Sequence, residues 1–138
     1  IRAHPVHRQF AKADALSKDA IGAAIEVHKA LGPGLLESVY EKCLVRELEL
    51  RGLLSERQQQ VRIECKGVVF EESLRFDMLV ESCLLIEVKA VQSTLPIHKA
   101  QVISYLKLLD VPLGLLINFH EVRLVDGVTR LLMPGANQ

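Results

Sequence analysis

The chain of 138 residues has the length of one ordinary domain, and its 49% hydrophobic and 25% charged residues are typical of a folded globular protein. Lys plus Arg and Asp plus Glu both number 17, so the overall positive charge of many nucleic-acid-binding proteins is absent. Contact with nucleic acid would therefore need a local patch. No apolar run reaches the roughly 18 residues that cross a bilayer, so we expect a cytoplasmic protein without membrane contact.

The first predicted elements are two helices separated by a sharp break. Apolar residues recur at helical spacing over residues 14–31, and a Gly-Pro-Gly break at 32–34 ends that pattern. A second apolar stripe covers residues 36–51. We expect residues 1–13 to form a flexible basic N-terminal segment and residues 14–138 to form a single domain.

After the helices, the apolar period changes from near 3.6 to near 2. This alternation predicts a three-stranded antiparallel meander over residues 61–65, 74–80 and 84–88. The following residues predict a buried helix over 96–109, a strand over 113–119, and a hairpin with strands 121–125 and 128–133 around Asp126-Gly127. The predicted fold class is α/β or α+β, with helices flanking a central mixed sheet.

Three charged residues lie within the predicted meander, in strands beside the core, where side chains are usually apolar. Asp77 follows Phe76 in one strand, and Glu87 and Lys89 occupy alternate positions in the next strand. An antiparallel register with Val80 opposite Leu84 brings Asp77 opposite Glu87, so two carboxylates face each other.

A facing pair of carboxylates supports two interpretations. Such a pair provides the oxygen ligands that Mg²⁺ prefers, and a nearby lysine can orient an attacking water or neutralise a phosphoryl transition state. Alternatively, Lys89 forms an ion pair with Asp77 or Glu87 that merely tethers adjacent strands.

The spacing of Asp77, Glu87 and Lys89 resembles the D-xn-(D/E)-x-K signature of the PD-(D/E)XK nuclease superfamily. The superfamily core, a helix, three strands, a helix and a strand, is similar to the order predicted above. Within the superfamily, residues 34–40 (GLLESVY) resemble the motif that gives the GxxExxY proteins their name, and residues 86–90 (IEVKA) continue the similarity. The resemblance thus implies a restriction-endonuclease-like core.

The resemblance also implies roles for individual residues. Asp77 and Glu87 would bind the metal, and Lys89 would act on water or phosphate. Glu37 matches a further acidic ligand of the superfamily, although a carboxylate in the first turn of a helix is also explained by capping. Gln101 and Tyr105 match a QxxxY element that contacts nucleic acid or the site, although core packing is an alternative for Tyr105.

These observations favour a metal-dependent nuclease that uses Mg²⁺ or Mn²⁺ to hydrolyse DNA or RNA. The alternative is a non-catalytic module that keeps a nuclease-like fold and binds nucleic acid or protein. The mean hydropathy of +0.21 is high for so small a chain, and it predicts a homodimer that covers part of the apolar surface.

Overall fold

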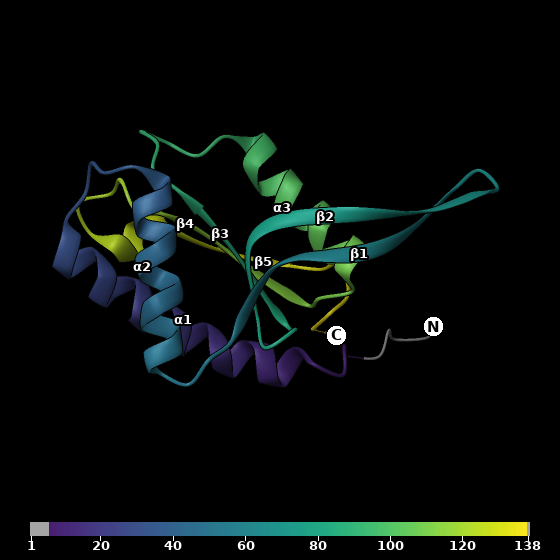
Figure 1. Cartoon of the computed structure of the whole chain (residues 1–138), viewed down its shortest axis with the longest axis horizontal. Helices are drawn as coiled ribbons and strands as arrows, with labels where there is room; N and C mark the ends of the chain where they lie inside the picture. The colour runs from purple at the N-terminus through teal and green to yellow at the C-terminus, as the bar shows by residue number, and fades with distance from the viewer. Residues whose placement is uncertain (1–5, 138) are drawn as a thin grey trace.

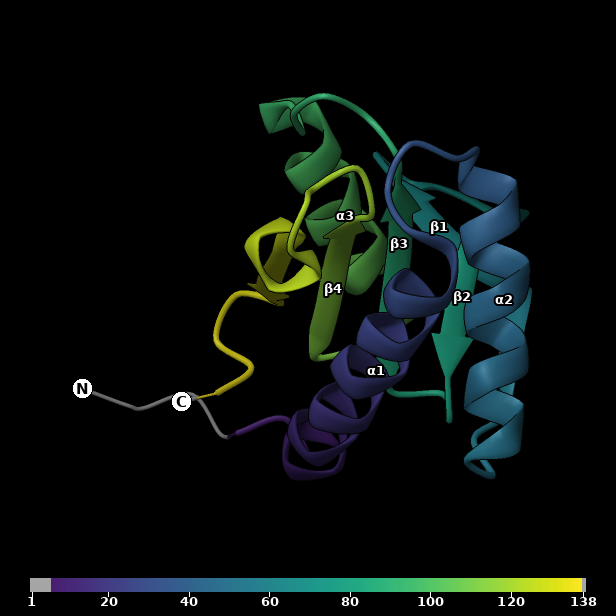
Figure 2. The same ribbon diagram turned by 90° about the vertical axis from the view of Figure 1, so that its left-hand side faces the viewer.

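The computed structural model describes residues 6–137 and contains one five-stranded sheet with helices on both faces (Figures 1 and 2). Helices α1 (Phe10–Leu31) and α2 (Glu37–Leu50) cover one face of the sheet, and α3 (Pro96–Leu109) covers the other. The expected fold class, an α+β protein with a mixed sheet between helices, is confirmed.

The strands lie in the sheet in their order along the chain, β1-β2-β3-β4-β5. All neighbouring strands are antiparallel except β3 and β4, which are parallel and are joined by α3. The expected antiparallel meander corresponds to the first three strands. The bounds are β1 Ser55–Cys65, β2 Val68–Val80, β3 Leu84–Lys89, β4 Leu113–Asn118 and β5 Val128–Leu132.

Two apolar cores form because the central strands β3 and β4 are buried on both faces. Ile86 of β3 packs with α1 and α2, whereas the neighbouring Leu85 packs with α3. Helix α3 approaches β4 closely, since a Cβ on Gly114 would lie 2.8 Å from the Val102 side chain. Apolar residues occupy consecutive positions in β3 and β4 because both faces of these central strands are covered.

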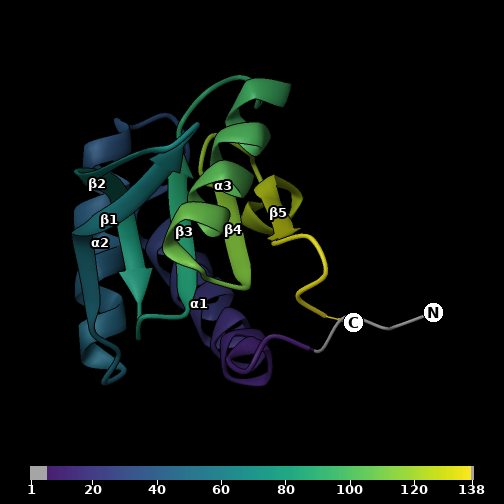
Figure 3. The ribbon, with the colours of Figure 1, turned by 90° about the vertical axis from the view of Figure 1, so that its right-hand side faces the viewer.

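Strands β1 and β2 are longer than the alternation predicted, and their hairpin projects from the body of the protein (Figure 1). We call residues 60–73 of this hairpin the arm. Figure 3 views the molecule with the arm directed toward the reader. Lys66 and Gly67 both have positive φ, 49° and 85°, as a two-residue turn of type I′ requires.

The predicted hairpin around Asp126-Gly127 is wrong. Residues 121–125 form no strand, and Leu124–Gly127 form a 3-10 helix that leads directly into β5. A Cβ on Gly127 would lie 2.2 Å from the Asn118 carbonyl oxygen, so this glycine permits a close backbone approach instead of a hairpin turn. The antiparallel partner of β5 is instead β4, which ends at Asn118 before this segment.

The first helix begins at Phe10, four residues before the expected boundary at Asp14. The backbone N–H of His7 donates to the Ala136 carbonyl over 2.9 Å, so this part of the segment contacts the C-terminal residues. Residues 1–5 lie outside the described range. Within residues 6–137, no helix is long and apolar enough to cross a membrane.

Candidate active site

The candidate site lies where β2 and β3 stop pairing through their backbones. Their antiparallel ladder covers three pairs, and it includes Val80 opposite Leu84, as the sequence predicted. Met78 opposite Ile86 is the last pair before the charged residues. On the other side of β2, the ladder with β1 shifts register between Glu56 and Gln58. Strand β2 is thus irregular on the stretch that carries Asp77.

Beyond the last backbone pair, the two carboxylates connect the strands. The Asp77 backbone N–H donates to Glu87 Oε1 over 3.1 Å, and the Val88 backbone N–H donates to Asp77 Oδ2 over 2.6 Å. Each carboxylate therefore accepts a hydrogen bond from the opposite strand. Glu87 is only 9% exposed, so these donors partly replace the water that burial removes.

Burial and a neighbouring negative charge raise the pKa of both acids. Burial, followed by the charge of Asp77, raises the pKa of Glu87 from 4.5 to about 8. Burial also raises the pKa of Asp77; the Val88 hydrogen bond opposes this shift, and the negative charge of Glu41 adds to it. Near neutral pH, the pair without a cation therefore retains a proton, mainly on Glu87.

Lys89 ends β3, two residues beyond Glu87, and is half-buried. Its positive charge lowers the pKa of both Asp77 and Glu87. Over residues 6–137, however, Lys89 forms no ion pair with either carboxylate. The lysine therefore acts on the acids through its electric field and not through a direct contact.

Asn118, a residue that the sequence did not single out for the site, fixes the backbone that follows Lys89. It lies opposite Lys89 in the parallel ladder and is 3% exposed. Its Oδ1 accepts from the Val91 and His120 N–H groups over 3.1 and 3.2 Å, and its Nδ2 donates to the Val91 carbonyl over 2.8 Å. The Phe119 N–H also donates to the Lys89 carbonyl over 2.8 Å. These bonds order the chain beside the lysine.

The tyrosine of the GxxExxY-like segment supports the loop between α1 and α2. The buried Tyr40 hydroxyl donates to the Gly32 carbonyl over 2.5 Å and accepts from the Leu35 N–H over 3.0 Å. Its ring stacks on Phe119, with 4.6 Å between the centroids. Gly34 in this loop has a φ of 92°, which favours glycine. Tyr40 thus anchors the loop to the end of β4.

Glu37 and Glu41 lie one turn apart at the start of α2. Glu37, expected as a ligand from the resemblance, is the first residue of the helix and is half-buried. Glu41, which we did not predict, is the acid whose charge raises the pKa of Asp77. Its side chain is 15% exposed and pairs with Arg57 of β1. Its spacing of four residues from Glu37 was the signal that could have revealed it.

Gln101 and Tyr105 occupy one face of α3, as expected. Gln101 is exposed, and its Nε2 donates to the Tyr105 hydroxyl over 3.4 Å. Tyr105 packs against the apolar cluster that contains Phe76, the residue before Asp77. The structure therefore brings Tyr105 to the strand of Asp77, whereas Gln101 stays at the protein surface.

Asp77 and Glu87 offer two carboxylates, the type of ligand that a hard divalent cation binds. In the absence of a cation, Glu87 is buried and lies close enough to Asp77 to retain a proton. In the part of the chain that the structure describes, no three His, Cys, Asp or Glu side chains converge closely enough to hold a metal ion. The two carboxylates of Asp77 and Glu87 fit a cation that keeps several of its water ligands, as Mg²⁺ usually does.

A sequence profile described as the PD-(D/E)XK nuclease superfamily matches residues 14–131. The chain belongs to this superfamily. A crystal structure of SSO0001 aligns with 88% of this chain and with 61% of its own chain, at 19% identity and a TM-score of 0.47. This chain spans less than two thirds of the length of that protein. No curated protein matches the sequence.

Proposed function

We propose that this protein is a metal-dependent phosphodiesterase of the nuclease type, acting on DNA or RNA. The observation that carries the proposal is the pair formed by the half-buried Asp77 and the buried Glu87, each accepting a backbone hydrogen bond from the other's strand, with Lys89 two residues beyond Glu87. A pair of acids with raised pKa values beside a lysine is more typical of a functional site than of strand pairing. Membership of the nuclease superfamily supports the same conclusion.

Asp77 and Glu87 would hold Mg²⁺ or Mn²⁺, and Glu37, the further acidic group that the resemblance implies, would act through a water bound to the cation. When bound, the cation supplies Lewis-acid stabilisation of the phosphate and lowers the pKa of a coordinated water. The loop that Tyr40 anchors ends at the start of α2, where Glu37 lies. The Tyr40 contacts therefore support the proposed role of Glu37 by ordering the chain before it.

Lys89 would orient the attacking water or neutralise charge on the phosphate. Its position on the ordered end of β3, beside the Asn118 hydrogen bonds, supports this role. Tyr105 and Gln101 would contribute contacts to the nucleic acid from α3, since the net charge of zero leaves binding to local groups.

A cleavage panel tests the proposal. Labelled single- and double-stranded DNA and RNA are incubated with Mg²⁺ or Mn²⁺, using the wild type, Lys89→Ala, and Lys107→Ala as a matched lysine on the outer face of α3. We expect metal-dependent cleavage by the wild type and by Lys107→Ala, with a loss of about a hundredfold or more for Lys89→Ala. Equal cleavage by both alanine variants would refute the role of Lys89.

The GxxExxY assignment within the superfamily also belongs to this proposal. The positive φ of Gly34 and the hydrogen bonds of Tyr40 support it, because they give two of the three motif residues a structural role in the same loop. A cytoplasmic location stays a prediction from the sequence.

A non-catalytic binding module is the second candidate, and one observation favours it. Within residues 6–137 no third acid completes a metal-binding group with Asp77 and Glu87. Thermal melts with Mg²⁺ or Mn²⁺ separate the candidates, because a cation that binds only the folded state raises the melting temperature. The nuclease predicts a rise for the wild type and none for Asp77→Asn; the binding module predicts no rise for either protein.

A further inference from the structure

Near its turn, one face of the arm is apolar, although the arm projects from the body of the protein (Figure 1). Ile63 lies opposite Phe70 in the ladder, and Cys65 lies opposite Val68, so these four side chains share a face. Phe70 is 43% exposed and Val68 is 60% exposed. Large apolar side chains on a projecting hairpin indicate a surface that a partner covers.

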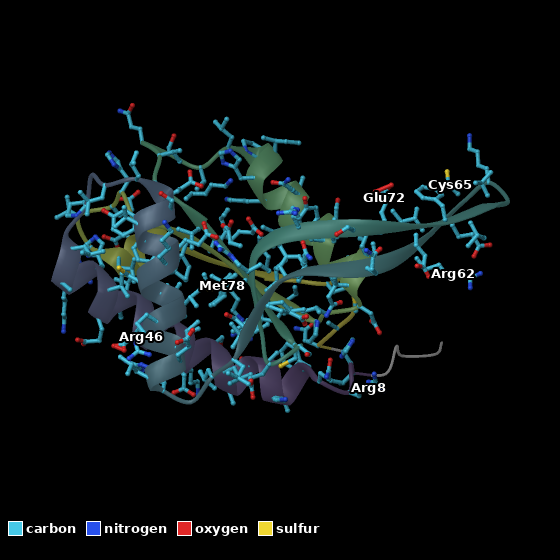
Figure 4. The ribbon with its side chains drawn as sticks, viewed as in Figure 1. Arg8, Arg46, Arg62, Cys65, Glu72 and Met78 are labelled. Carbon is cyan, nitrogen blue, oxygen red and sulfur yellow. The ribbon has the colours of Figure 1, made fainter. Side chains whose placement is uncertain are left out.

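The charge of the arm disfavours nucleic acid as that partner. Residues 60–73 contain two basic residues, Arg62 and Lys66, and three acidic residues, Glu64, Glu71 and Glu72. A segment with a slight negative charge gains little from a polyanion. In Figure 4, Arg62 points to one side of the arm, whereas Cys65 and Glu72 point to the other, so the arginine lies away from the apolar face.

Strand β1 is an edge of the sheet, with no further strand beside it among residues 6–137. The two-residue turn pairs Cys65 with Val68 through the backbone, and the alternation of an antiparallel ladder then turns the backbone groups of Arg62 and Glu64 outward. The arm segment of β1 has no proline. Another strand can therefore add to this edge.

The sequence of this edge is complementary to itself. When residues 60–66 (QVRIECK) pair antiparallel with a second copy about Ile63, Arg62 lies opposite Glu64 in both halves. Ile63 then lies opposite itself, and Val61 lies opposite Cys65, so the apolar faces of the two arms become continuous. In this register each charged residue of 61–65 thus lies opposite a residue of opposite charge, and each apolar residue lies opposite an apolar one. Only the terminal pair of Gln60 and Lys66 lacks such a match.

Neighbouring registers lack this match. A pairing centred on Arg62 places that arginine opposite its own copy, which is repulsive. A pairing centred on Val61 places Ile63 opposite Gln59 and Glu64 opposite Gln58, so it exposes apolar surface to polar partners. The register about Ile63 is therefore favoured over both.

We propose that the arm is a self-association surface, in which β1 of two copies pairs antiparallel about Ile63 and joins the two sheets. The occupant of the apolar face and edge is a second copy of this chain, related by a two-fold axis through the Ile63 pair. This proposal does not depend on nuclease activity. It assigns a specific interface to the homodimer expected from the composition.

Charge reversal on the arm tests the proposal by sedimentation velocity of the purified chain. The wild type should be a dimer in the micromolar range. Arg62→Glu and Glu64→Arg should each weaken dimerisation by about tenfold or more, because each places like charges opposite one another twice. An equimolar mixture of the two variants should restore the dimer as a heterodimer, since every 62–64 pair is then opposite in sign. The double variant R62E/E64R should also dimerise.

Arg46→Glu, an equal charge change at an exposed position on α2, is the control and should dimerise like the wild type (Figure 4). Circular dichroism checks that each variant is folded. A monomeric wild type, single variants that still dimerise, or a mixture that stays monomeric would each overturn the proposal. A monomeric wild type whose binding to a labelled duplex is lost in Arg62→Glu would instead assign the arm to nucleic acid.

Discussion

Removing the ionisable group of Glu87 while keeping its shape should make the metal-free protein more stable at neutral and alkaline pH. The amide oxygen of Glu87→Gln can still accept from the Asp77 N–H, but it carries no charge into the buried site. Below pH 4.5 the wild type is protonated in both the folded and the unfolded state, so the stability difference between wild type and variant is then independent of pH.

The folded protein holds the Glu87 proton up to about pH 8, whereas the unfolded chain releases it near 4.5. The stabilisation present below pH 4.5 is therefore lost as pH rises through about 8. The pKa difference of about 3.5 corresponds to about 5 kcal/mol when complete, of which about 3 kcal/mol is already lost at neutral pH. Glu87→Gln should not show this loss.

The assay is urea unfolding of both proteins between about pH 4 and 9, in EDTA. The free energy of unfolding of the variant minus that of the wild type should increase from about pH 4 to about pH 9. Taking this difference removes the contribution of the groups that titrate alike in both proteins. Glu26→Gln, at an exposed acid of α1, is the control and should follow the wild type. A difference that stays constant with pH would refute the conclusion that burial holds a proton on Glu87.

Three further substitutions test the supports of the site. Asn118→Ala leaves the Val91 N–H and carbonyl without their side-chain partner and should lower the free energy of unfolding by about 2 to 4 kcal/mol in urea titrations; a loss below half a kcal/mol would contradict the ordering role. Tyr40→Phe keeps the stack on Phe119 but removes both hydroxyl hydrogen bonds, so a loss of about 1 to 2 kcal/mol is expected, and unchanged stability would count against the loop anchor. Gly127→Ala places a Cβ against the Asn118 carbonyl and should lower the melting temperature by about 5 °C or more; a wild-type melting curve would show that the backbone there yields easily.

The order of elements and the pairing of the acidic strands followed from the sequence alone. Alternation of apolar residues fixes which side chains of a strand share a face, and the short connection between Val80 and Leu84 leaves one register that keeps both strands' apolar residues in the core. That register brings Asp77 to Glu87. The local pattern was misleading at Asp126-Gly127, because a glycine needed for close packing has the same sequence signal as a turn glycine.

Only the tertiary structure decided the environment of the site. The raised pKa of Glu87 depends on burial beneath elements that are distant in sequence, and the charge of Glu41 reaches Asp77 only because α2 packs beside the sheet. Asn118 forms hydrogen bonds with Val91, 27 positions away in the sequence, because β4 pairs in parallel with β3. Hydrogen bonds and electrostatic fields depend on distances in space, and helix packing and strand crossover set those distances without leaving a periodic signal in the chain.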